Sequence, residues 1–172
     1  MPFSREIKRT IALVLTAALA CCMILGGCSQ QMGAQSSEQE ESGPTSRSYM
    51  ADMNEASDAL KEKMASFSDA VAREDLVSMR VQADGITSVI DQMSQMEAPD
   101  ELSDLKQKYV DACTQLKDAL IAYIDLYAEI DSSTVRNPFD YDGYADRIGA
   151  IQAQYDAAVQ ALQDADKSAT EM

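Results

Sequence analysis

The chain has 172 residues, with 29 Asp and Glu against 14 Lys and Arg, and its formal net charge is −15. It contains no His and no Trp, which excludes Ser-His-Asp and Cys-His catalysis and every zinc, copper or haem site that needs a His ligand. The acidic balance argues against nucleic-acid binding, because that function requires clustered basic charge to neutralise phosphate.

The first 27 residues have the pattern of an export signal. Arg5, Lys8 and Arg9 are basic, and the run 11–25 that follows is uncharged and almost entirely apolar. This run is short for a membrane span and has the length of the apolar region of a secretory signal. We therefore expect residues 1–27 to direct export and to lie outside the folded domain.

The apolar run ends in Leu25-Gly26-Gly27-Cys28, which resembles the lipobox of bacterial lipoproteins. In that family the Cys thiol receives a diacylglyceryl group, and a peptidase cuts just before the Cys. The resemblance implies that Cys28 becomes the lipidated first residue of a mature chain held outside the cytoplasm, on the cell membrane or on the outer membrane if the cell has one. The alternatives are an uncleaved membrane anchor and ordinary signal cleavage near Gly26 and Gly27.

Residues 28–45 comprise this Cys and a segment with the composition of a flexible linker. The segment is rich in Ser, Gln, Glu and Gly and contains no aromatic residue. Such a composition cannot bury enough apolar area to offset the entropy lost on ordering. About 17 residues of this kind reach about 20–25 Å, which would hold a folded domain clear of the lipid headgroups.

From residue 46 to residue 168, apolar residues recur at steps of three and four, which is the period of an amphipathic helix. Sustained alternation of period two is absent from the sequence, so we expect no strand. Four apolar stripes follow one another, from Tyr49 to Val71, from Leu76 to Met93, from Leu102 to Ile130 and from Tyr144 to Ala165.

Short connections between such stripes favour antiparallel neighbours. The sequence therefore predicts an all-α fold, an up-down-up-down four-helix bundle over residues 46–168 with a tail at 169–172. The alternative is a three-helix bundle with a bent first helix.

The break between the first two stripes carries no Gly or Pro. We place it at Arg73–Asp75, with Asp75 as the N-cap of the second helix. The main reason is length, because one helix over residues 46–97 would run about 78 Å at 1.5 Å per residue. The shorter neighbouring helices could not cover it.

The other two breaks are marked by Pro. Pro99, followed by two acidic residues, indicates the start of the third helix, since acids suit the positive end of the helix dipole. The polar segment Ser132–Phe139 contains an Asn-Pro pair and is predicted to be a loop. Asn137 or Asp140 is expected to cap the last helix.

Cys113 is the one cysteine that remains if residues 1–27 are removed and Cys28 is lipidated. No intramolecular disulfide is then expected, and stability must come from the core. Cys113 flanks the third apolar stripe, so we expect a buried, inert thiol. An exposed thiol that forms an intermolecular disulfide is the alternative.

Two acidic patterns favour a solvated surface over a metal centre. One is a stripe of acids seven residues apart on the outward side of the third helix; the other, Asp140-Tyr141-Asp142-Gly143, superficially resembles a calcium loop. In the latter the Gly follows the second Asp directly and no Glu stands at the twelfth position, so the EF-hand pattern fails. We expect no cofactor and no metal site, with weak divalent-cation binding as an alternative. The stripe comprises Glu97, Asp104, Asp111, Asp118 and Asp125.

Antiparallel topology places the predicted connections 72–75 and 132–140 at the end opposite the linker. Aromatic and acidic residues gather there, and loops on a rigid scaffold commonly carry binding residues. The candidate partner-binding residues are Tyr127, Arg136, Asp140, Tyr141, Asp142 and Tyr144.

The function that these patterns favour is a membrane-anchored, non-enzymatic helical lipoprotein. It would serve as a binding or structural module of the cell envelope, with an envelope protein or polymer as its partner. The alternatives are an enzyme of the glycan hydrolase type that uses carboxylates alone and a weak divalent-cation binder.

Overall fold

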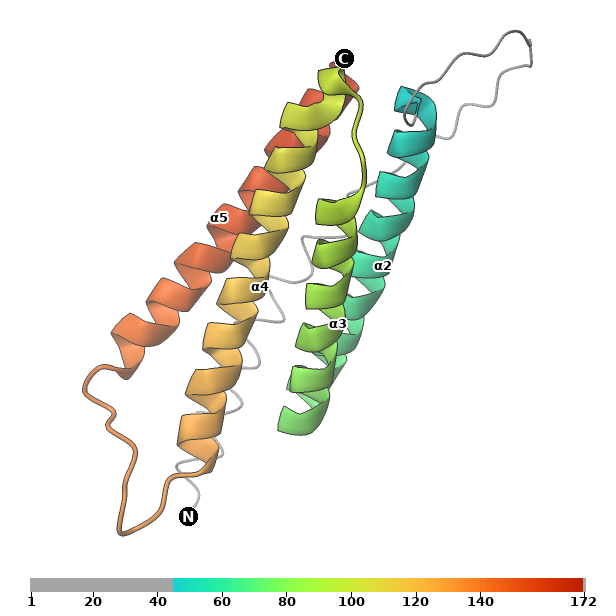
Figure 1. The fold of residues 1–172 in the computed structure, drawn as a ribbon. Coiled ribbons are helices and arrows are strands. Elements are labelled where there is room, and N and C mark those ends of the chain that lie inside the picture. The colour runs from blue at the N-terminus through green and yellow to red at the C-terminus, as the bar shows by residue number, and fades with distance from the viewer. Residues whose placement is uncertain (1–44, 172) are drawn as a thin grey trace, which may run out of the picture.

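The computed structural model of the chain describes residues 45–171, and the regular elements in this part are helices (Figure 1). Consecutive helices run in opposite directions, which confirms the predicted all-α four-helix bundle. The predicted signal at residues 1–27, Cys28 and nearly all of the linker lie outside the described residues. The four long helices are α2 (Ser46–Ala72), α3 (Leu76–Gln95), α4 (Ser103–Asp131) and α5 (Tyr144–Thr170), and a short 3-10 helix, Asp100–Leu102, precedes α4.

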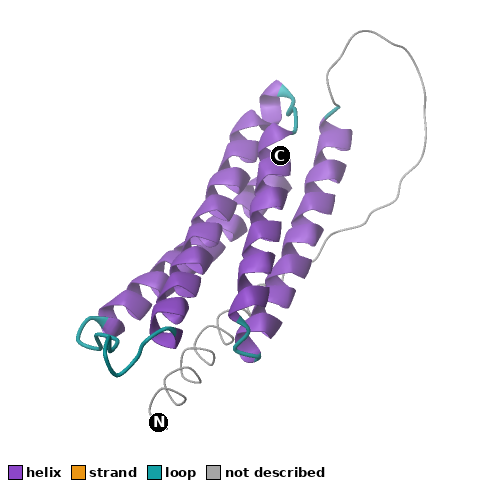
Figure 2. Ribbon diagram, turned by 60° about the horizontal axis from the view of Figure 1, so that its bottom comes forward, coloured by secondary structure: helices purple, strands orange, loops and turns teal. Residues whose placement is uncertain are grey.

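Helix α4 occupies the centre of the packing, because it contacts both α3 and α5 extensively. Helix α2 packs mainly on α3, and α2 and α5 approach each other much less closely than the other neighbouring pairs. The α2–α3 turn and the α4–α5 loop lie at one end of the bundle, and the α3–α4 connection lies at the other (Figure 2). This arrangement fixes which surfaces stand away from Ser46, where α2 begins.

The predicted apolar stripes form the core. Every residue of the first stripe is buried, as are all residues of the second and third except Leu76 and Tyr109, which are half-buried. Helix α5 is the least embedded, since Tyr144, Ile148 and Leu162 of its stripe are only half-buried. Burial of one apolar face by each helix is the main source of stability in such a bundle.

The first break falls where the sequence predicts it. Asp75 is the N-cap of α3, and its carboxylate accepts a hydrogen bond from the backbone N–H of Ser78 at 3.0 Å. Glu74 adopts a left-handed conformation with φ 57°. Its N–H bonds to Val71 O and that of Asp75 bonds to Ala70 O, both at 3.0 Å, which is the Schellman pattern of a helix C-terminus. The two helices are thus separated by a tight turn, and the bent-helix alternative is wrong.

Pro99 lies directly before the 3-10 helix that leads into α4, which confirms the predicted start of the third helix. Helix α5 continues to Thr170, past the predicted end of the bundle at residue 168. Ala169 packs against the core from this last turn, so part of the expected tail belongs to the bundle.

The predicted cap of α5 is wrong. The N-cap position is Gly143, and no side chain caps the helix there. The Asp140 carboxylate instead accepts a hydrogen bond from the N–H of Asp142 at 3.0 Å, so it closes a local turn. Asn137 is engaged in a second turn through Thr134. Both side chains lie too early in the chain to reach the first turn of a helix that begins at Tyr144.

Candidate functional site

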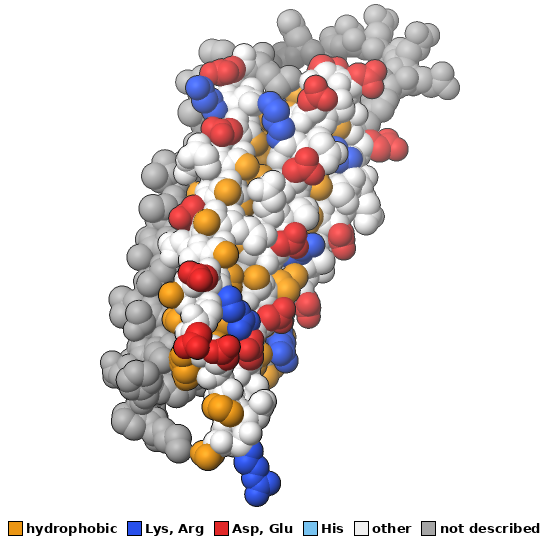
Figure 3. Space-filling view, turned by 90° about the vertical axis from the view of Figure 1, so that its left-hand side faces the viewer, with side chains coloured by type: hydrophobic (Ala, Val, Ile, Leu, Met, Phe, Trp, Pro, Cys, Tyr) orange, Lys and Arg blue, Asp and Glu red, His pale blue; other side chains and the backbone are white. Residues whose placement is uncertain are grey.

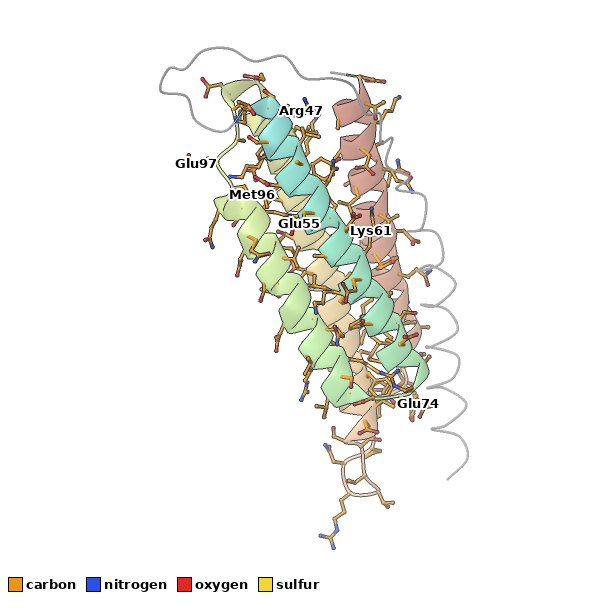
Figure 4. The ribbon with its side chains drawn as sticks, turned by 90° about the vertical axis from the view of Figure 1, so that its right-hand side faces the viewer. Arg47, Glu55, Lys61, Glu74, Met96 and Glu97 are labelled. Atoms are coloured by element: carbon orange, nitrogen blue, oxygen red, sulfur yellow. The ribbon has the colours of Figure 1, made fainter. Side chains whose placement is uncertain are left out.

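We call the end of the bundle that carries the 73–75 turn and the 132–143 loop the far end, and define it as residues 64–83 and 121–151. The Tyr127 hydroxyl donates a hydrogen bond to the Glu74 backbone O at 3.3 Å, which joins α4 to the turn. At the opposite end the Ser46 hydroxyl donates to the Glu101 carboxylate at 2.6 Å. Arg47 and Met96 lie at that opposite end and Glu74 at the far end (Figure 4).

The interior of the far end is aromatic. Phe67 of α2 packs edge-on against Tyr123 of α4, with ring centroids 6.3 Å apart, and Tyr123 lies 6.4 Å from Tyr127. All three side chains are buried. Burial raises the pKa of Tyr127 to about 12, and the nearby Glu74 and Asp131 charges contribute to the increase. Tyr127 therefore lies beneath the surface that the sequence assigned to it.

A second aromatic group seats the 132–143 loop on the bundle. Phe139 is buried, and Tyr141 and Tyr144 meet its ring edge-on at centroid distances of 4.8 Å and 6.2 Å. The Arg147 guanidinium lies 5.9 Å from the same ring and donates to the Glu129 carboxylate at 2.6 Å. This hydrogen bond lowers the pKa of Glu129. Phe139 thus anchors the loop, a role that the sequence did not indicate.

The remaining predicted site residues differ in how they are presented. Asp140, Asp142 and Arg136 are exposed, and Tyr141 has 42% of its surface exposed. Tyr144 is half-buried, and burial raises the pKa of its hydroxyl. The structure therefore gathers all six predicted residues at one end, with four of them on the surface.

The apex of the loop is held by two hydrogen bonds between Thr134 and Asn137. The Thr134 N–H donates to Asn137 O at 2.9 Å, and the Asn137 N–H donates to the Thr134 hydroxyl at 3.1 Å. Between them stand Val135, which is 82% exposed, and the exposed Arg136. Arg136 makes no ion pair within residues 45–171, whereas Arg147 is engaged by Glu129.

In the described part of the chain, the large hydrophobic side chains that are exposed all lie at the far end. Acidic side chains are scattered over the surface seen from the α5 side (Figure 3). Isolated exposed apolar residues are ordinary, but these five all lie in the half of the bundle away from Ser46. They are Val77 (73% exposed), Val81 (57%), Ile121 (40%), Val135 (82%) and Tyr141 (42%).

A polar group lies in the other half of the bundle, between α4 and α5, and the sequence did not indicate it. The Tyr109 hydroxyl donates to the half-buried Asp166 carboxylate at 2.5 Å. Burial is the main cause that raises the pKa of the Tyr109 hydroxyl, and the hydrogen bond to Asp166 raises this pKa further. Cys113 is fully buried beside the Met93 thioether, which confirms the predicted buried thiol; burial raises its pKa to about 12.

The acidic stripe begins at Glu97, before α4, and ends at Asp125 within α4. All of its residues are exposed, as predicted. Among residues 45–171, no three His, Cys, Asp or Glu side chains are grouped closely enough to hold a metal ion. No Asp or Glu in this part is buried, so the described residues offer no buried carboxylate pair.

Comparisons with protein-family models, with curated proteins and with solved structures gave no match to this chain. None of the helices between residues 45 and 171 has the length and apolar character needed to cross a membrane.

Proposed function

We propose that this chain is a lipid-anchored, non-enzymatic helical binding module that works outside the cytoplasm. The anchor is Cys28, and the proposal draws on the basic start, the apolar run and the Leu25-Gly26-Gly27-Cys28 resemblance in the sequence. Two or more acyl chains give stable membrane attachment, whereas one gives only marginal binding.

The binding role rests on one observation, the gathering of exposed hydrophobic side chains at the far end. The linker enters at Ser46, on the opposite end of α2, and α2 is about 40 Å long at 1.5 Å per residue. A chain anchored through Cys28 would carry the far end away from its own membrane. That end is where a second component of the envelope would meet it.

The residues that would contact the partner are those of the predicted set that are exposed. Tyr141 offers an amphipathic ring, and Asp140, Asp142 and Arg136 offer charged groups around it. Tyr and Arg are enriched in interaction surfaces. Tyr127 and Tyr144 would support this surface from below.

The test compares what the intact, membrane-anchored protein retains on pull-down. Tyr141→Ala combined with Asp142→Ala should weaken retention of the partner while helix content and melting temperature stay nearly unchanged. Charge reversal at Asp104, Asp111 and Asp118 is the matched control on the exposed stripe. If the stripe variant loses the partner and the Tyr141/Asp142 variant keeps it, the binding surface is the acidic side of α4 and the proposal fails.

A further inference from the structure

We propose that the partner of the far end is a protein whose contact surface is apolar at its centre and basic at its rim. This inference rests on the proposed function, because it names the class of partner that the same surface would take. Three features of the far end carry it: its exposed apolar side chains, the identity of its cations and the balance of its charges.

The exposed apolar residues lie on three elements of the far end. Val77 and Val81 lie one turn apart on α3, and Ile121 lies on the adjacent α4. Val81 and Ile121 stand at similar distances from the Tyr127–Glu74 contact, about 10 Å along their helices at 1.5 Å per residue. Val135 and Tyr141 lie in the loop.

Aliphatic side chains favour a protein as the partner. Valine and isoleucine offer no hydrogen-bond donor or acceptor to the hydroxyl groups of a glycan, and Tyr141 is the one exposed aromatic ring of the apolar set. The complementary surface for such residues is apolar, and the centres of protein interfaces supply it.

The cations of the far end are all arginines, and the lysines of the described chain lie elsewhere. Protein interfaces are enriched in Arg and Tyr and depleted in Lys. The arginine side chain also loses less entropy per hydrogen bond, because its fork is planar and pre-organised. The arginines are Arg73, Arg80, Arg136 and Arg147, and the lysines are Lys61, Lys63, Lys106, Lys108, Lys117 and Lys167.

Carboxylates nevertheless outnumber these arginines at the far end. Eight exposed carboxylates lie there against four arginines, and the Arg147 charge is already balanced by Glu129. The eight are Asp69, Glu74, Asp125, Glu129, Asp131, Asp140, Asp142 and Asp146. The whole chain is also strongly acidic, with a formal net charge of −15. Phosphate polymers and anionic lipid headgroups would be repelled, whereas a basic rim would be steered toward the surface.

The loop is ordered before any partner arrives. Phe139 fixes its base, and the Thr134–Asn137 and Asp140–Asp142 hydrogen bonds hold its two turns. A pre-organised loop loses little conformational entropy on binding, so its exposed residues can contribute directly to affinity.

The experiment begins with a photoreactive benzophenone amino acid in the intact, membrane-anchored protein. It is placed at Val135 or Val81, both exposed at the far end, and at the exposed Ala51 near the linker as the control position. Illumination should give the same discrete protein adduct from Val135 and Val81 and none from Ala51. The adduct is identified by mass, and the adducted protein is then purified for kinetics.

The second step measures association of that protein with Asp140→Asn/Asp142→Asn. Asparagine keeps the acceptor that holds the Asp142 N–H and removes both charges. The control is Asp52→Asn/Asp91→Asn, which changes the net charge equally at two exposed sites in the other half of the bundle. The far-end pair should slow association roughly threefold to tenfold at low salt, more than the control pair, and high salt should remove the difference.

Each other outcome overturns the proposal in a distinguishable way. A lipid or glycan adduct from Val135 overturns the protein assignment and leaves the far end as a binding surface. Faster association of the Asp140/Asp142 variant shows that the partner rim is acidic, and equal slowing by both variants shows that no local rim exists. Absence of any adduct from Val135 and Val81 overturns the proposed function as well.

Discussion

Replacement of Glu74 by Gly should stabilise the bundle. Glu74 closes the α2–α3 turn with φ 57°, a conformation that costs an L-residue about 1–2 kcal/mol and costs Gly almost nothing. Gly also gains entropy in the unfolded chain, which offsets about 0.4–1 kcal/mol. The net stabilisation should be about 0.5–1 kcal/mol, because the backbone bond from Tyr127 is retained.

Thermal and urea unfolding, followed by far-ultraviolet circular dichroism, would measure this change. The melting temperature should rise by about 2–5 °C for a domain of this size. Glu74→Ala is the first control, since it removes the side chain but keeps the backbone penalty, and it should not stabilise. Ala65→Gly is the second, in the exposed middle of α2, and should destabilise by about 1 kcal/mol. If Glu74→Ala stabilised as much as Glu74→Gly, the side chain and not the backbone would be the source of strain.

Three other tests concern the core, the anchor and the buried hydroxyl and thiol groups. Leu116→Ala, at a site with 2% exposure, should cost about 2–5 kcal/mol, while Asp111→Ala on the outward face should change stability by about 0.5 kcal/mol or less in the same melts. Cys28→Ser should release the protein from membranes or leave it unprocessed, and fractionation with mass analysis of the N-terminus would check this; an unmodified N-terminus other than Cys28 in the wild type would contradict it. Folding raises the pKa of Tyr127 from 10.0 and that of Cys113 from 9.0, both to about 12. Their contribution to the free energy of unfolding is therefore complete below about pH 9 and is lost as the pH rises toward 12. We expect the protein to unfold in alkali, with tyrosinate absorbance rising in the same transition.

Periodicity was enough to predict the fold because each helix buries one continuous face. Residues at steps of three and four lie on one side of a helix, and the first three stripes, from Tyr49 to Val71, from Leu76 to Met93 and from Leu102 to Ile130, became buried faces almost without exception. Helix length then located the first break, and Asp75 was a sufficient capping signal. These arguments succeed because they depend on local geometry that any antiparallel arrangement preserves.

The features that the sequence did not predict depend on local conformations or on contacts between distant residues. No composition rule indicates that Glu74 would adopt the conformation usually taken by Gly. The Tyr109–Asp166 hydrogen bond joins residues on different helices, and Asp166 falls beside the apolar stripe of α5, where a charged residue is expected to be solvated. The cap of α5 was mispredicted because Asp140 found a nearer N–H donor in its own turn.

The sequence predicted the location of the candidate site more accurately than the role of each residue in it. Antiparallel topology was sufficient to bring the 73–75 turn and the 132–143 loop to one end. Which aromatic residues face solvent was not determined by topology, since Tyr127 and Tyr141 differ in burial although both lie at that end. Tyr127 lies on the buried side of α4, whereas Tyr141 lies in the loop at the edge of the buried Phe139 ring.

The aromatic interior of the far end explains why this end can combine exposed apolar side chains with a defined shape. Phe67, Tyr123 and Tyr127 link α2, α4 and the 73–75 turn, and Tyr144 is close enough to Tyr123 to affect the pKa of its hydroxyl. Tyr144 in turn packs on Phe139 at the base of the loop. The turn and the loop therefore stand on one rigid aromatic base. Rigid support of this kind holds Val77, Val135 and Tyr141 in exposed positions before a partner binds, which reduces the conformational entropy lost on binding.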